Sequence, residues 1–156
     1  SCNGIESKFN AMNKPKNVFI QGPISPGFIA DSIAKHQTKT SIGAHNIFLG
    51  QVRADTIQDK IVRSIIYSAY EEMANKAFHA IRERIFAQYA ITCMHIYHSL
   101  GHVKAGEICL FVFVSAPHRK VVLEALEALV EAIKAEVPVF GKELFDNETH
   151  QWKVNQ

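Results

Sequence analysis

The chain has 156 residues, of which 47% are hydrophobic and 21% are charged, a composition typical of one globular domain and not of a disordered chain. Seventeen basic and fifteen acidic residues leave a net charge of only +2, which argues against a nucleic-acid binder that relies on bulk charge. No apolar run approaches the roughly 20 residues that a membrane-spanning helix needs. Any site for an anion must therefore be local.

The cysteines give no sign of a metal motif. Cys2, Cys93 and Cys109 are odd in number and show no metal-binding spacing. Two of them lie in apolar patterns that are typical of strands. We therefore interpret them as reduced, structural thiols, and we expect a soluble protein of the cytoplasm.

The first residues predict a tail. Residues 1–17 show neither apolar periodicity nor the pattern of a signal peptide. We expect a flexible N-terminal tail there, followed by a single domain over residues 18–156. In this domain residues 18–21 predict a short strand. Ser25 followed by Pro26 is a helix-start signal, and the apolar spacing after it predicts a helix that ends near His36.

Two long strands are predicted next. Residues 42–52 and residues 61–70 have strand patterns, and the polar segment between them predicts a loop, so we expect a hairpin. Arg53 directly follows the first of these strands. An arginine at the mouth of a strand pair is well placed to hold an anion, yet most such arginines are solvated, and the spacing leaves both interpretations open.

A helix and a histidine-bearing strand follow. Apolar residues recur every four positions over residues 71–89 and predict an amphipathic helix. The next segment, which predicts a strand, carries His95, His98 and His102. His95 and His98 are three residues apart and should point to opposite faces, so the three do not converge on one ion. We expect structural or exposed histidines and no metal site.

Residues 108–114 are an apolar run that predicts a central strand covered on both faces. Ser115 as N-cap and Pro117 in the first turn predict a helix over residues 117–135. His118 and Arg119 lie in its first turn, where the helix dipole favours anions over cations. The pair predicts a phosphate or carboxylate site, and the alternative is that both side chains extend into solvent.

The last part predicts two short strands. Pro138 ends the helix, because the residue before a proline avoids helical geometry. Residues 139–145 then predict an edge strand, and Trp152 predicts a last strand that closes the core. On spacing alone, Lys134 is interpreted as a surface lysine paired with Glu131.

Several segments, in this order and spacing, resemble the MoaE family, the large, catalytic subunits of molybdopterin synthase. The resemblance spans residues 18–155. Its segments are GQVR at 50–53, YSAYEEMA at 67–74, IYHSLG at 96–101, GEICLFVFVSAPHR at 106–119 and IKAEVPVFGKE at 133–143.

The resemblance implies an α/β (α+β) domain with a hammerhead-like arrangement, a mixed sheet and three main helices, which forms a homodimer within a heterotetramer. It implies a small ubiquitin-like sulfur-carrier subunit as partner, whose C-terminal Gly-Gly ends in a thiocarboxylate. The carrier would pass sulfur to cyclic pyranopterin monophosphate and so form the dithiolene of molybdopterin. No cofactor, metal, nucleic acid or membrane is implied.

The resemblance also implies a site. By motif position Lys134 and Lys142 resemble catalytic lysines of the family. The residues that resemble its substrate-binding set are Gln51, Val52, Arg53, His118 and Arg119, of which the last two would reach the site across the dimer.

The chain departs from the family at three positions. Gly141 replaces the first of two successive basic residues, and Lys142 matches the second; Gln51 replaces a lysine and Ser99 an arginine. The missing lysine keeps open a rival interpretation, a non-catalytic dimer that binds a ubiquitin-like tail or a phosphorylated metabolite. A third is a generic phosphate-binding α/β enzyme.

Overall fold

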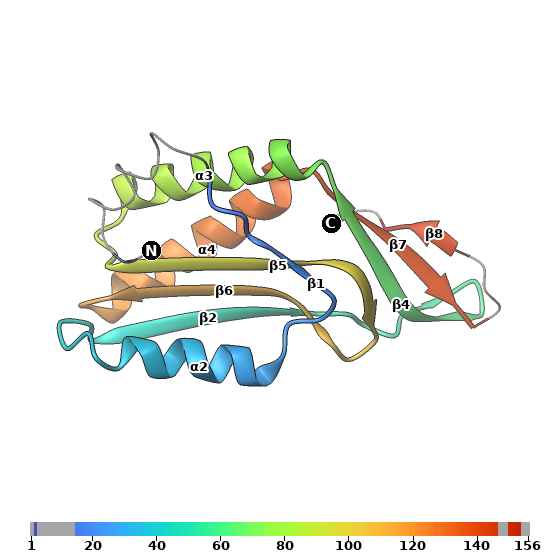
Figure 1. Ribbon diagram of the computed structural model, residues 1–156, viewed down its shortest axis with the longest axis horizontal. Coiled ribbons are helices and arrows are strands. Elements are labelled where there is room, and N and C mark those ends of the chain that lie inside the picture. Colours follow the sequence, from blue (N-terminus) through green and yellow to red (C-terminus); the bar gives the residue numbers. More distant parts are fainter. Residues whose placement is uncertain (1, 3–14, 147–149, 154–156) are drawn as a thin grey trace.

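The computed structural model describes residues 2, 15–146 and 150–153, which form three helices and eight strands (Figure 1). The expected tail, residues 1–17, lies mostly outside them. The helices are α2 (Pro26–His36), α3 (Glu71–Gln88) and α4 (Arg119–Glu136). The strands are β1 (Phe19–Gln21), β2 (Ala44–Gln51), β3 (Thr56–Ile57), β4 (Lys60–Ala69), β5 (Cys93–Lys104), β6 (Ile108–Ala116), β7 (Val139–Phe145) and β8 (His150–Trp152).

The strands form one mixed sheet in the order β2-β6-β5-β4-β7-β8, with β1 beside β5 and β3 beside β4. The β1–β5 pair is parallel and the other pairs are antiparallel. β5 links two limbs of the sheet, since residues 93–98 pair with β6 and residues 101–104 pair with β4. Between them Gly101 has a φ of 82°, which glycine adopts without strain. In Figure 1 β4 and β7 run steeply across the end of the β5-β6-β2 limb.

β6 is the central strand that its apolar run predicts, because it lies between β2 and β5 and is covered on both faces. Leu110, Val112 and Val114 pack with α3 and α4 in the larger core. Phe111 and Phe113 belong to a second core on the opposite face, to which α2 contributes. The sheet thus has α3 and α4 on one face and α2 on the other (Figure 1). The α+β class, mixed sheet and three main helices expected from the sequence are confirmed.

The helix boundaries agree with the sequence with one exception. Ser25 caps α2 as predicted, because its Oγ accepts a hydrogen bond from the Phe28 main-chain nitrogen at 3.1 Å. The predicted cap of α4 at Ser115 is wrong. Ser115 is a buried residue of β6 and its Oγ bonds to Nδ1 of His45 at 2.6 Å. The N-cap of α4 is His118, which makes no side-chain capping bond.

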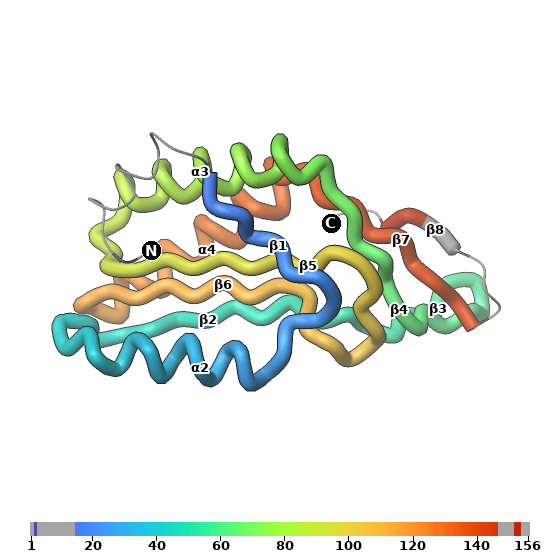
Figure 2. The backbone as a smooth tube through the Cα atoms, viewed as in Figure 1, coloured from blue at the N-terminus to red at the C-terminus, as the bar shows by residue number. Residues whose placement is uncertain are grey.

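The predicted hairpin is also wrong. β2 pairs with β6, whereas β4 pairs with β5 and β7. The reason is that the presumed loop contains β3, which makes its own tight hairpin with the start of β4 through Gln58 and Asp59, both at positive φ. Figure 2 shows β3 next to β4, at the end of the molecule where β7 and β8 also lie.

The two C-terminal strands form as predicted, but their places in the sheet differ from the prediction. β7 is not an edge strand, because it pairs with both β4 and β8. Trp152 lies in a short strand as predicted, but it is 58% exposed and does not close the core. No helix in the described part of the chain is long and apolar enough to cross a membrane.

Candidate active site

A pocket of about 490 Å³ lies where the C-terminal end of α4 meets β4, β5 and β7. Lys134, in the last turn of α4, lies on its wall. The polar residues around it are Tyr67 of β4, His98 of β5 and Lys153, just after β8. Aliphatic side chains from the end of α4 and from β7 complete the lining, together with the main chain at Gly141.

Two of the polar groups are neutral near pH 7. His98 is buried, and burial lowers its pKa to about 4, with the charge of Lys134 acting in the same direction. Its Nδ1 donates to the Ser99 carbonyl oxygen at 2.8 Å, which leaves Nε2 without a proton in the neutral ring. Burial raises the pKa of Tyr67, whose ring packs edge-on against His98 at 5.2 Å. The positive charge of the pocket therefore comes from its lysines.

The main chain at Gly141 holds Lys153 in place. The Lys153 nitrogen donates to the Gly141 carbonyl oxygen at 2.7 Å. A Cβ atom at Gly141 would lie 3.0 Å from Cγ2 of Ile65 and 3.4 Å from Cε1 of Tyr67, so a side chain here would start against the pocket wall. The chain has no side chain at 141, and the lysine that lies at this wall comes from position 153.

Lys153 was not predicted from the sequence as a residue of this pocket. The register of β7 with β8 is what brings Lys153 to the pocket. Lys142 pairs with Trp152, and Lys153, the residue after Trp152, then bonds to Gly141. No local pattern in the sequence indicates that register. Lys142 itself is half-buried and does not line the pocket. Adjacent residues of a strand point to opposite faces, which separates Lys142 from the wall that Gly141 belongs to.

Arg53 lies at the end of β2, and its guanidinium forms an exposed ion pair with Asp55 at 3.4 Å. Arg53 is not among the residues that line the lysine pocket. Burial raises the pKa of Glu143 of β7, and the charge of Asp55 also raises it, while the charges of Lys153 and Arg53 lower it. The charges of Arg53 and Lys153 therefore both act on the Glu143 carboxyl group.

The other two residues of that segment differ in exposure. Gln51 is exposed at the end of β2, whereas the Val52 side chain is only 1% exposed. The Val52 main chain bonds to Glu107 and Gly106, at 3.0 and 2.8 Å. The contribution of Val52 is thus to fix the strand end from which Arg53 extends.

His118 and Arg119 lie far from this pocket within one chain. Both are exposed, and with Lys120 they line a second, open hollow of about 790 Å³ at the N-terminal end of α4. Fifteen residues separate Arg119 from Lys134, which corresponds to about 22 Å along an α-helix. A single chain therefore brings Lys134 and Lys153 together at one end of α4 and leaves His118 and Arg119 at the other, while Arg53 lies outside both pockets.

Comparisons with known proteins were made with both the sequence and the fold. Residues 22–136 match the family model described as MoaE protein. A protein of Pyrococcus abyssi named molybdopterin synthase catalytic subunit is 34% identical over 141 residues, which cover 90% of this chain and 88% of that protein. The relative of the same name from Drosophila grimshawi is 38% identical over 117 residues, or 74% of this chain. The chain spans only about a third, 32%, of the length of that relative.

Solved structures give the same picture of the fold. The structure of molybdopterin synthase from Staphylococcus aureus superimposes with a TM-score of 0.74 at 26% identity, covering 87% of this chain and 95% of that one. A complex of subunits 1 and 2 of molybdopterin-converting factor from Helicobacter pylori contains a chain with a TM-score of 0.75 at 20% identity, which covers 88% of this chain and 90% of that one.

Proposed function

The chain belongs to the MoaE family, and from this premise we propose that it is the catalytic subunit of a molybdopterin synthase. Its reaction is the transfer of sulfur from the thiocarboxylated C-terminus of a small ubiquitin-like carrier to cyclic pyranopterin monophosphate. The observation that carries the proposal is the pocket at the end of α4, which contains Lys134 and Lys153 beside two neutral groups, His98 and Tyr67.

The chemistry needs positive charge at this place. The carrier tail brings an anionic thiocarboxylate, and its sulfur forms a bond to a carbon of the precursor. A carbon–oxygen bond at that carbon breaks, and the oxygen leaves in protonated form. Water then attacks the carrier carbonyl, the carbon–sulfur bond to the carrier breaks, and the sulfur stays on the pterin. Two such transfers make the dithiolene. A fixed ammonium group stabilises the oxyanion that develops during the attack of water, and Lys134 is in position to supply it.

We assign the second ammonium of the pocket to Lys153. Lys142, which matches a family lysine by sequence position, does not line the pocket. Lys153 does line it, and its main chain is bonded to Gly141, the position where this chain lacks the family's basic side chain. The proposed site therefore contains two lysines, Lys134 at the end of α4 and Lys153 just after β8.

Substrate binding is proposed to use Arg53 of one chain and His118 and Arg119 of the partner subunit. A guanidinium suits the phosphate of the pterin because it remains charged and donates two hydrogen bonds in a fork. The separation of Arg119 from Lys134 along α4 is the reason for a second chain, because in a two-fold dimer the N-terminal end of one α4 can complete the pocket of its partner. Gln51 and Val52 support Arg53 from the end of β2. With two carriers the assembly is a heterotetramer.

The remaining parts of the proposal concern the domain and its compartment. Residues 18–156 are proposed to act as one domain. A cytoplasmic location agrees with the cysteines, since Cys2, Cys93 and Cys109 form no disulfide in the structure.

A non-catalytic binding module is the second candidate, and Gly141 favours it because a family lysine is missing there. A reconstituted reaction separates the candidates. The chain is mixed with a thiocarboxylated Gly-Gly carrier and the cyclic precursor, and both carrier binding and dithiolene product are measured. Binding with product supports the proposed synthase, and binding without product supports the module. Absence of carrier binding contradicts both and leaves a generic phosphate-binding enzyme.

A further inference from the structure

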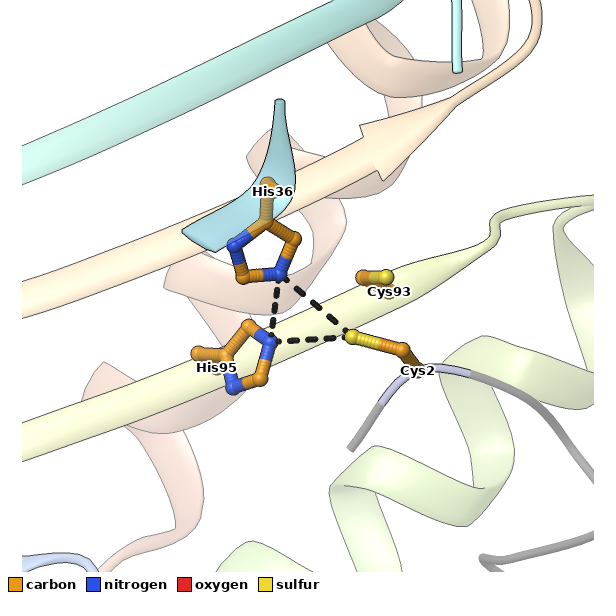
Figure 3. Close-up of side chains that lie close together, drawn as sticks. All are labelled: Cys2, His36, Cys93 and His95. Carbon is orange, nitrogen blue, oxygen red and sulfur yellow. Dashed lines mark hydrogen bonds between the residues drawn. The ribbon is translucent and has the colours of Figure 1, made fainter. Parts of the chain in front are cut away.

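A cluster of four potential metal ligands lies away from the lysine pocket. Cys2, His36, Cys93 and His95 place one sulfur or ring nitrogen each within 4.8 Å of all the others. The Sγ atom of Cys2 lies 3.3 Å from Nε2 of His95 and 3.4 Å from Nε2 of His36. The two Nε2 atoms are 2.9 Å apart. Figure 3 shows the two rings and the Cys2 sulfur turned toward one another, with Cys93 beside them.

The fold explains why three of these side chains meet. Cys93 and His95 are two residues apart at the start of β5, so both point to the same face of the sheet. His36 is the last residue of α2, the helix that covers this face, and its ring packs against Phe113 at 4.7 Å. His95 and His98, three residues apart, point to opposite faces, whereas the Cys93–His95 pair, two residues apart, shares one face. The sequence led us to expect no metal site, and the position of these four donor atoms is the observation that speaks against that expectation.

The surroundings orient one of the rings for binding. Nδ1 of His36 donates to the main-chain oxygen of Ser32 at 2.7 Å, because a carbonyl oxygen only accepts. In the neutral ring the proton is therefore on Nδ1, and the lone pair of Nε2 is directed into the cluster. A second-shell bond of this kind, from the outer ring nitrogen to a carbonyl, is typical of histidines that bind metal ions. His36 is also buried, which limits competition from water.

The donor set determines the kind of ion. Two thiolates and two imidazoles are the ligands of closed, tetrahedral zinc sites, and together they neutralise a divalent cation. For zinc–nitrogen bonds of about 2.0 Å and zinc–sulfur bonds of about 2.3 Å, tetrahedral geometry puts the donor atoms roughly 3.3 to 3.8 Å apart. The distances of 2.9, 3.3 and 3.4 Å are slightly shorter. These three donor atoms need to separate by only about half an ångström or less to admit the ion. The sulfur of Cys93 lies within 4.8 Å of each of them, and a shift of up to about 1 Å brings it to the tetrahedral spacing.

We propose that Cys2, His36, Cys93 and His95 form a structural Zn²⁺ site that links Cys2 to α2 and β5. All four positions are filled by protein ligands, so the site has no open position for a substrate. The site does not depend on the proposed sulfur transfer, because none of its residues lines the lysine pocket.

The test measures metal in the full chain, purified without a polyhistidine tag from cells supplied with zinc. Elemental analysis after dialysis is expected to give about one zinc per chain, as for a closed four-ligand site. Cys93→Ser and His95→Gln are expected to lose it. Cys109→Ser and His102→Gln are the matched controls, because they change a buried thiol and an exposed histidine outside the cluster, and they are expected to retain it.

Cobalt substitution gives a readout of the ligands themselves. Co²⁺ in the wild-type chain is expected to show the strong visible bands of a tetrahedral site and a thiolate charge-transfer band. That band is expected to weaken in Cys2→Ser, a variant that leaves both core clusters unchanged, and to be unchanged in Cys109→Ser. Circular dichroism identifies any variant that fails to fold. If Cys93→Ser or His95→Gln does not fold, the Co²⁺ absorption spectrum of Cys2→Ser decides whether the cluster binds the metal.

Three results would overturn the proposal. One is a reduced wild-type chain that binds neither zinc nor cobalt. The second is zinc content that Cys93→Ser and His95→Gln leave unchanged in folded protein. The third is a Cys2–Cys93 disulfide in mass spectra of the native chain, combined with no metal uptake after reduction.

Discussion

The main-chain nitrogen of Lys153 donates to the carbonyl oxygen of Gly141 at 2.7 Å. This bond brings a lysine from the end of β8 to the pocket of Lys134 at the place where β7 has a glycine. The relationship predicts that Lys153→Ala lowers the rate of sulfur transfer by about 10- to 100-fold, the effect of losing a charged hydrogen bond of about 1.5 to 3 kcal/mol. Single-turnover measurements of dithiolene formation check it.

Lys142→Ala is the matched control for this change. Lys142 is the neighbour of Gly141 on the same strand but lies outside the pocket lining. Its replacement is expected to change the rate less than about twofold, because the half-buried side chain does not line the pocket. If Lys142→Ala proves the more damaging variant, the assignment to Lys153 is wrong.

Lys134 is expected to be indispensable for the chemical step. Lys134→Ala should abolish dithiolene formation, because the oxyanion loses the ammonium group that we propose stabilises it. The side chain is exposed, so folding and binding of the carrier should be unchanged. Thermal unfolding and calorimetry with the carrier measure these two properties. Lys76→Ala removes a lysine of α3 that pairs with Glu72, and it should keep full activity; product formation by Lys134→Ala would remove Lys134 from the mechanism.

Arg53 is expected to contribute to binding of the phosphate. Arg53→Ala should weaken affinity for the cyclic precursor by about 1.5 to 3 kcal/mol, the range for a hydrogen bond to a charged group. Arg63→Ala is the control, since Arg63 is also exposed and also pairs with an aspartate, Asp146. Calorimetry that finds equal affinities for the two variants would exclude this role for Arg53.

His98 predicts a loss of stability in weak acid. Its pKa is about 4 in the folded chain, mainly because of burial, and near 6.5 when unfolded. Between these values the unfolded chain binds more protons, so the free energy of unfolding falls as the pH decreases from about 6.5 toward about 4. From pH 7 to pH 5 the contribution of His98 to this loss is about 2 kcal/mol.

Denaturant unfolding of the wild-type chain and of His98→Gln, each at both pH values, isolates this contribution. The variant should lose less stability than the wild type over the same interval, because a glutamine does not titrate. An equal loss in both chains would show that His98 is not the group responsible.

Much of the fold could be predicted from local patterns. The run at residues 108–114 identified the central strand, since burial on both faces requires continuous apolar residues. Ser25 and Pro26 located the start of α2, because capping is a property of a few adjacent residues. Strand pairing was not predicted, because it depends on contacts between distant segments. The hairpin assigned to β2 and β4 failed for this reason.

Some residues of the candidate sites could likewise be predicted from local motifs, and others could not. Lys134 and Arg53 were predicted from motifs along the chain, and Lys134 lines the pocket while Arg53 does not. Lys153 and the grouping of Cys2 with His36, Cys93 and His95 were missed. Lys153 is far from Gly141 in the sequence, and His36 is far from the Cys93–His95 pair. These residues meet only through the register of β7 with β8 and the packing of α2 on β5. Sequence spacing carries no information about either.

Completion of each pocket by the other subunit is tested by mixing two inactive variants. Lys134→Ala and Arg119→Ala chains are unfolded together, refolded and assayed with the carrier and the precursor. In a mixed dimer one pocket receives both substitutions and the other none, so random pairing should restore about a quarter of wild-type activity. Activity no higher than that of either variant alone would contradict the account.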